Sequence, residues 1–151
     1  MPSLIMSVPT WKRNESKVQF LDTAFHLVEF TLTHMKKFPK SATFYICVPV
    51  MENARNIYKY CCTANARFPK CEEDIKFRKD QLNLALGELD SMDASLTIAF
   101  NAYSISLRND SKESVRFTSN ELTEWGELIH SERNLIIKLL ESDAKRDFSK
   151  N

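Results

Sequence analysis

The sequence predicts an all-α protein that forms an antiparallel up-down-up-down four-helix bundle. The chain of 151 residues contains only two glycines, whereas all-β folds and phosphate-binding loops both use many. Four long segments carry apolar residues at helical spacing, and three breaks separate them. Short connections place successive helices antiparallel, which gives the up-down order. The expected organisation is an N-terminal arm (1–13), the bundle (14–146) and a short tail (147–151).

The first helix is expected to begin at Asn14, a residue type that often caps helices, and to end near Lys37. Its apolar residues are spaced alternately by three and four, the pattern of a coiled-coil-like packing face. This face consists of Val18, Leu21, Phe25, Val28, Leu32 and Met35, and it is widened by Phe20, Ala24 and Leu27. Pro39 ends the helix because the residue before a proline disfavours helical geometry.

The second helix is expected to use Ser41 as its cap and to end near Ala66. Pro49 lies inside it and has no backbone N–H, so we predict a kink or a late start there. The expected apolar face consists of Phe44, Val48, Met51, Tyr58 and Cys62. The sequence Phe68-Pro69 forms the next break.

The third helix is expected to begin at the acidic run 72–74, which favours the positive end of the helix dipole, and to extend for about 33 residues. Apolar residues recur in it every seven positions, with small or flexible residues between them. They are Ile75, Leu82, Leu89, Leu96 and Tyr103, with Ala85, Met92 and Ala99 between. A polar break is expected at residues 108–117.

The fourth helix has the clearest start signal in the chain. Thr118 and Glu121 have the spacing of a capping box, and Phe117 with Leu122 has that of the hydrophobic staple. The apolar face then continues through Leu122, Trp125, Ile129, Ile136 and Leu139, with Leu128 and Leu135 beside it.

Composition and motifs argue against a membrane, a cofactor or a catalytic centre. No apolar run approaches the roughly 18 residues that a membrane helix needs, and the N-terminus lacks the apolar core of a secretory signal. Met1 and Met6 remain alternative starts. The four cysteines lack CxxC spacing, so we expect reduced thiols in a cytoplasmic protein. A di-iron site needs two Glu-x-x-His pairs, and only Glu127 and His130 form one. We therefore predict no catalytic residue, no metal and no cofactor.

The charge is unevenly distributed. Residues 1–80 carry 13 Lys and Arg against 8 Asp and Glu, whereas residues 81–151 carry 8 against 12. The basic half suits either an anionic partner or the acidic half of another subunit. The candidate nucleic-acid-binding residues are Lys12, Arg13, Arg55, Lys59, Arg67, Lys70, Arg78 and Lys79. Arg78 stands at an apolar heptad position, so the alternative for it is a buried ion pair, with Asp74 as the nearest carboxylate.

Several short motifs resemble the accessory variability determinant (Avd) proteins of diversity-generating retroelements. They are Met6-Ser-Val-Pro9, Lys12-Arg13, Glu15-Ser-Lys17, Ala64-Asn65, Phe68-Pro69, the run from Glu73 through Phe77-Arg-Lys-Asp-Gln81 to Ala85 and Leu89, and Trp125, Leu139 and Ser142-Asp143. The resemblance covers the chain from Met6 to about Arg146, and its motifs are short.

The resemblance implies a non-enzymatic bundle that assembles into a homopentamer and binds a reverse transcriptase together with its template RNA or DNA. It implies that Arg78 and Lys79, and the pair Lys12 and Arg13, contact the nucleic acid. The alternative is a related bundle of a mobile element or of a ribosomal RNA intervening sequence, with no polymerase partner. A metal-dependent bundle enzyme is the third hypothesis.

Overall fold

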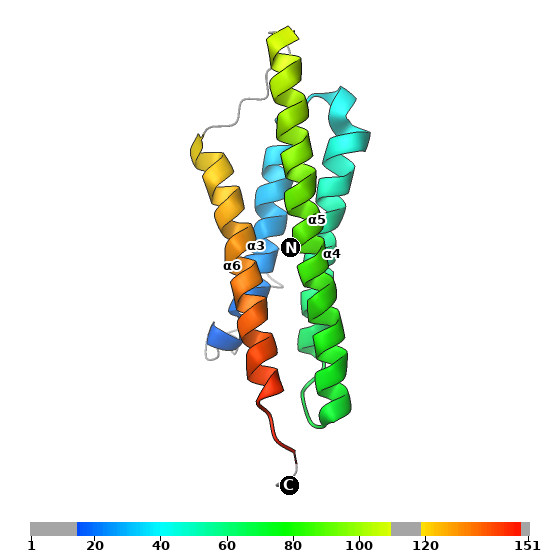
Figure 1. The fold of residues 1–151 in the computed structure, drawn as a ribbon, viewed down its shortest axis with the longest axis vertical. Coiled ribbons are helices and arrows are strands. Elements are labelled where there is room, and N and C mark those ends of the chain that lie inside the picture. Colours follow the sequence, from blue (N-terminus) through cyan, green and yellow to red (C-terminus); the bar gives the residue numbers. More distant parts are fainter. Residues whose placement is uncertain (1–14, 110–118, 149–151) are drawn as a thin grey trace.

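The computed structural model describes residues 15–109 and 119–148, and all regular secondary structure in these ranges is helical. The fold is a four-helix bundle, in which four long helices lie side by side (Figure 1). The helices are α3 (Glu15–Met35), α4 (Val48–Ala66), α5 (Glu72–Asn109) and α6 (Ser119–Ala144). Two short turns precede α4, the 3-10 helix η1 (Lys40–Ala42) and the π-helix η2 (Thr43–Cys47).

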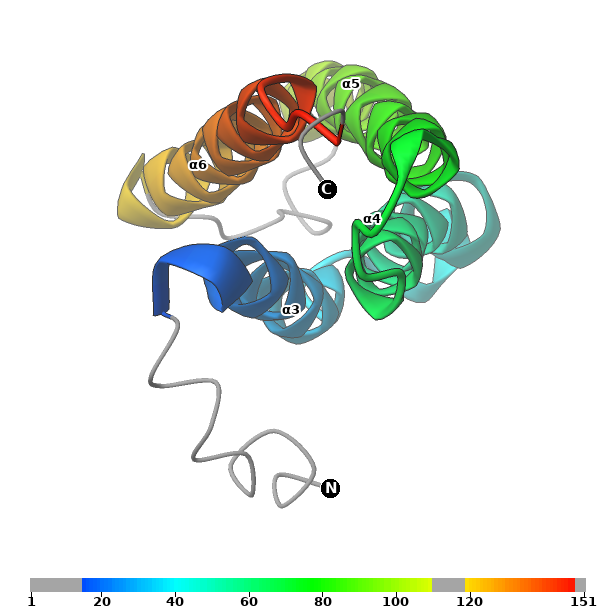
Figure 2. The ribbon, with the colours of Figure 1, turned by 90° about the horizontal axis from the view of Figure 1, so that it is seen from below.

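Each helix packs against the next one in the chain, and α6 returns to pack against α3. The end view shows this ring of four helices (Figure 2). Polar contacts between α4 and α5 fix how the two helices are paired: Asn53 reaches Glu88, while the Ala64 carbonyl reaches Arg78. Residue numbers therefore rise along α4 as they fall along α5.

The prediction for α5 is confirmed where its side chains are described. Six of the predicted residues are buried, Ile75 is half-buried, and the side chain of Tyr103 lies outside those described. The six buried residues are Leu82, Ala85, Leu89, Met92, Leu96 and Ala99. A seven-residue repeat keeps one face of a long helix directed at its neighbours, so a strict repeat identified this face correctly. The helix has 38 residues and starts at Glu72 as expected.

The predicted faces of α3 and α4 were wrong, because the face that is buried in each helix is rotated about the helix axis relative to the predicted one. In α3 the residues expected only to widen the face are its centre, and Leu32 is 51% exposed. The buried residues of α3 are Phe20, Ala24, Leu27, Phe30, Thr31 and Met35. Those of α4 are Val50, Asn53, Ala54, Ile57, Cys61 and Ala64. Each helix has an apolar stripe wider than its buried face. Contact with two neighbours then decides which part of the stripe is buried.

The start of α4 confirms the effect predicted for Pro49. The α-helix begins at Val48 with this proline in its first turn, and η2 precedes it as a single π-helical turn. The Val48 N–H donates to the Thr43 carbonyl, five residues back. Because Pro49 has no N–H, it cannot donate to the Tyr45 carbonyl, and an α-helix cannot continue backwards through it. Phe44 therefore does not continue the face of α4 and is 85% exposed.

Two expected caps differ in outcome. Ser41 was expected to cap the second helix, but the helical chain starts at Lys40, after Pro39, without a side-chain cap hydrogen bond. At α6 the residues of the expected capping box and staple, Phe117 and Thr118, lie outside the described residues. The Glu121 carboxylate contacts Lys37, two residues after the end of α3, and its Oε2 lies 3.5 Å from Nε2 of His34. These contacts join the start of α6 to the end of α3.

The face of α6 agrees with the sequence at Trp125, Ile129 and Ile136, which are buried. Trp125 is 1% exposed, and its ring meets those of Phe30 and Phe100 edge-on at centroid distances of 5.6 and 6.1 Å. No helix within the described ranges is long and apolar enough to cross a membrane.

Candidate nucleic-acid interface

The candidate basic residues fall into three groups. Lys12 and Arg13 lie outside the described residues. Five side chains are exposed: those of α4, of the α4–α5 turn and of the start of α5. They are Arg55, Lys59, Arg67, Lys70 and Lys79. The remaining candidate, Arg78, is buried, with 6% of its surface exposed.

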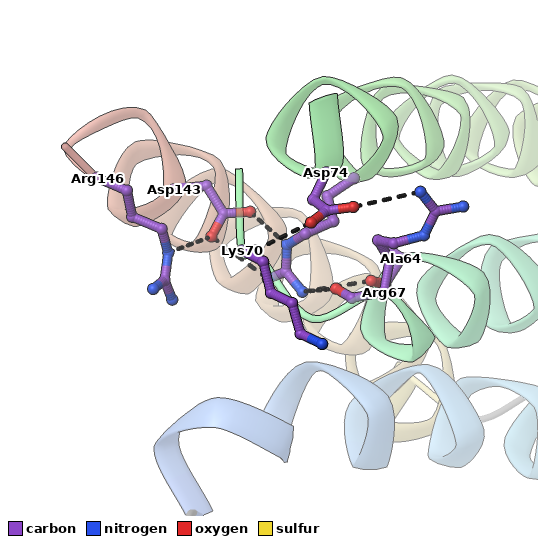
Figure 3. Close-up of polar contacts among 7 residues, drawn as sticks. Ala64, Arg67, Lys70, Asp74, Asp143 and Arg146 are labelled. Carbon is purple, nitrogen blue, oxygen red and sulfur yellow. Dashed lines mark hydrogen bonds and ion pairs between the residues drawn. The ribbon is translucent and has the colours of Figure 1, made fainter. Parts of the chain in front are cut away.

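The α4–α5 turn is organised by Asp74 (Figure 3). Its carboxylate accepts a hydrogen bond from the Lys70 backbone N–H at 3.0 Å and one from Arg67 Nη1 at 3.3 Å. The pKa of Asp74 is lowered, first by the Lys70 bond and then by the bonds from Cys71 and Arg67. The Arg67 guanidinium also lies 4.2 Å from the centre of the Phe77 ring. Arg67 is therefore partly engaged within the protein, whereas Lys70 uses only its backbone here.

The Arg78 side chain forms its hydrogen bonds inside the protein and is not directed toward solvent. Its Nε donates to Asp143 Oδ2 at 2.7 Å and its Nη2 to Asp143 Oδ1 at 3.3 Å. Its Nη1 donates to the backbone carbonyls of Arg67 at 3.0 Å and Ala64 at 3.3 Å. A guanidinium with these partners has no donor directed at a phosphate, so Arg78 is removed from the candidate interface. Its partner is Asp143 of α6 and not Asp74, because Asp74 contacts the turn.

The Arg78–Asp143 pair joins the ends of three helices (Figure 3). The carbonyls at the C-terminal end of a helix lack partners within the helix and carry partial negative charge. Arg78 donates to one such carbonyl in α4 and to the adjoining carbonyl of Arg67, while its carboxylate partner lies in the last turn of α6. Asp143 also accepts a bond from Arg146 at 3.4 Å. Sequence reasoning named Arg78 as a possible ion pair but did not identify this partner.

A groove of about 510 Å³ lies between α3 and α4. It contains two of the candidate cations, Arg55 and Lys59, beside aromatic, amide and acidic side chains. The lining residues are Phe25, Val28, Glu52, Arg55, Asn56, Tyr58 and Lys59. The Phe25 and Tyr58 rings meet edge-on, with centroids 5.5 Å apart. The sequence had placed both rings in the packing seam, and their position at its margin brings them to the groove.

Hydrogen bonds fix two of the side chains that line this groove, Tyr58 and Asn56. The pKa of Tyr58 rises to about 12, chiefly because of burial and then because of its hydrogen bond with Cys62. Asn56 donates from Nδ2 to Glu88 Oε1 of α5 at 3.2 Å, which fixes its amide.

Glu132 is the buried group that sequence reasoning missed. It lies in α6 between Ile129 and Ile136, and it is fully buried. Its Oε2 accepts only a long contact from the Cys61 thiol, at 3.9 Å, and its Oε1 has no hydrogen-bond partner. Burial raises the pKa of the Glu132 carboxyl well above its ordinary range, although the Cys61 contact opposes this. Its spacing from two buried isoleucines is the signal that could have identified it.

The single Glu-x-x-His pair of the sequence is exposed. Glu127 and His130 both face outward, and His130 Nε2 contacts the Asn134 amide at 3.1 Å. Among the side chains that the structure describes, no three His, Cys, Asp or Glu groups come together in a way that could hold a metal ion. The four cysteines are free thiols, with Cys61 buried and Cys71 exposed.

Comparison with known proteins does not assign this chain to a family. No protein-family model matches it, and no curated protein and no solved structure is significantly similar to it.

Proposed function

We propose that the protein is a non-enzymatic adaptor, an up-down-up-down antiparallel bundle that binds a reverse transcriptase and its template RNA or DNA. The observation that carries the proposal is the exposure of five cations on α4, the α4–α5 turn and the start of α5. None of them is buried in the core, in contrast to Arg78. The family resemblance of the sequence motifs supplies the reverse transcriptase as partner.

Exposed Lys and Arg side chains bind nucleic acid by neutralising phosphates and releasing counterions. Such contacts position the backbone and carry little sequence information. Affinity should therefore fall steeply between about 50 and 200 mM salt and depend weakly on sequence. Arg55 and Lys59 are the best placed, because they lie one turn apart on α4 and border the same groove.

The proposed adaptor is a cytoplasmic homo-oligomer, a pentamer by resemblance. A basic first half and an acidic second half suit a head-to-tail ring. Large apolar side chains on the outside of α5 and α6 supply surface that a subunit contact would bury: Leu84 is 47% exposed, Ile98 68% and Ile137 38%. Light scattering should give five times the 17.5 kDa chain mass, and a monomer at micromolar concentration would refute this part.

The test is copurification of the tagged protein from its native cells, with and without ribonuclease, followed by identification of any reverse transcriptase that it captures. Capture of the polymerase supports the adaptor. RNA binding without any polymerase capture would favour the alternative, a bundle of a mobile element or of a ribosomal RNA intervening sequence. Failure to bind either RNA or polymerase would refute the adaptor and leave the alternative bundle without a polymerase partner.

A further inference from the structure

The groove between α3 and α4 combines aromatic, basic and acidic side chains in one space. Phe25 and Tyr58 supply aromatic surface, Arg55 and Lys59 supply positive charge, and Glu52 supplies a carboxylate. Its volume of about 510 Å³ falls within the roughly 300–1,000 Å³ typical of small-ligand sites. This combination of side chains restricts the possible ligands more than the exposed basic surface does, because that surface could bind any polyanion.

The carboxylate argues against a ligand that is only a phosphate. Glu52 lies three residues before Arg55 and seven before Lys59 on α4, so all three project into the groove from one helix. Arg55 and Lys59 alone would be enough to bind a simple anion, which has no hydrogen-bond donor for Glu52. A base with an exocyclic amine can donate to this carboxylate while its phosphates contact the two cations.

The two rings argue for a base that has left the helical stack. Unpaired bases bind proteins by stacking on aromatic side chains, while cations beside them hold the flanking phosphates. Tyr58 is held by Cys62 and by its edge-on contact with Phe25, so its ring is fixed in place. A duplex keeps its bases stacked inside and could use only the cations.

We infer that this groove binds an unpaired nucleotide of single-stranded RNA or DNA, with its base on Phe25 or Tyr58 and its phosphates at Arg55 and Lys59. This deepens the proposed function and rests on it, because it names the form of nucleic acid that the adaptor holds. A preference for single-stranded over duplex nucleic acid would distinguish binding in this groove from general binding of any polyanion to the basic surface.

The test compares a short single-stranded RNA with a duplex of the same length, by fluorescence anisotropy at about 100 mM salt. Because loss of a stacking ring costs about 1–3 kcal/mol per base, Tyr58→Ala should weaken single-strand binding by roughly 5- to 150-fold. Tyr58→Phe, which keeps the ring, should bind like the parent. Tyr45→Ala is the matched control, because Tyr45 is 65% exposed and is not among the residues that line the groove. Duplex binding should be the same for all three variants.

A second measurement needs no variant and so does not depend on folding. Single-stranded RNA carrying 5-iodouridine is irradiated with the parent protein, and the crosslinked tryptic peptide is identified. The crosslink should fall on Tyr58, within residues 56–59, or on Phe25. Crosslinks elsewhere only, or equal affinities for Tyr58→Ala and Tyr45→Ala, would overturn the inference and leave the adaptor standing. If Tyr58→Ala no longer captures the polymerase but binds RNA with unchanged affinity, the groove binds a segment of the polymerase instead, and the inference is overturned. No binding of RNA by the parent would overturn the RNA part of the proposed function as well.

Discussion

The buried carboxyl group of Glu132 should make the stability of the bundle fall as the pH rises. In the unfolded chain this carboxyl ionises near pH 4.3. In the folded protein its pKa is raised, because burial disfavours the charged form. Below the unfolded pKa both states are protonated and the group has no effect on stability. Above it the unfolded state gains a charge that the folded state does not, and the free energy of unfolding decreases.

The size of the effect follows from proton linkage. One proton bound more tightly in the folded state changes the free energy of unfolding by about 1.4 kcal/mol per pH unit. The decrease should begin at about pH 4.3, where the unfolded carboxyl ionises, and continue until the pH reaches the folded-state pKa. Each pH unit within this window is therefore a noticeable part of the stability of a typical domain.

The assay is urea unfolding at several pH values for the parent and for Glu132→Gln, which keeps the shape but cannot ionise. The difference between the two curves should grow with pH at the slope given above, whatever constant offset the amide introduces. Glu127→Gln is the matched control, because Glu127 lies on the exposed side of the same helix. Parallel curves for the parent and Glu132→Gln would show that the carboxyl is solvated in solution, and the argument from burial would fail.

Three further predictions concern packing, the buried ion pair and the surface. Trp125→Ala should cost roughly 3–5 kcal/mol of stability in urea unfolding, because the ring fills the core between Phe30 and Phe100; a melting temperature within a degree or two of the parent would contradict this. Asp143→Ala should cost about 3–5 kcal/mol, because it leaves the Arg78 guanidinium buried without its carboxylate, and an unchanged urea midpoint would show that water replaces it. Lys79→Ala should leave the melting temperature unchanged and lower the salt dependence of RNA binding by about one unit of slope, so an unchanged slope would exclude Lys79 from the interface.

The sequence predicted the four helices and most of their ends, because proline breaks and helical periodicity are local signals. It also predicted the buried face of α5, where a strict seven-residue repeat leaves no choice of face. It did not predict which part of the broad apolar stripes of α3 and α4 is buried. Leu32 is as apolar as the residues that are buried, and only the positions of the neighbouring helices exclude it from the core. Phe44 is exposed because the π-helical turn before Pro49 takes it off the face of α4.

Charge was a weaker guide than apolar spacing. The sequence identified Arg55 and Lys59 as exposed cations, but it grouped Arg78 with them by charge and by resemblance. Whether an arginine is exposed depends on which carboxylate the fold brings to it. Asp143 is 65 residues away along the chain, so no local pattern could name it. Glu132 differs from Asp143, because its spacing from Ile129 and Ile136 is a local signal of burial, but glutamate is a residue type that is rarely fully buried.

The faces of α4 can be altered independently, which makes the proposed interface separable from the fold. Ala54 and Ile57 are fully buried, while Arg55 and Lys59 on the same helix are exposed. Exposed Lys and Arg side chains away from the core contribute little to stability, so their replacement should change binding and not folding. Arg78 behaves in the opposite way, because its replacement should lower stability whether or not nucleic acid is present. Affinity and the urea midpoint, measured together for one variant of each kind, therefore distinguish a surface that binds RNA from a basic residue that holds the bundle together.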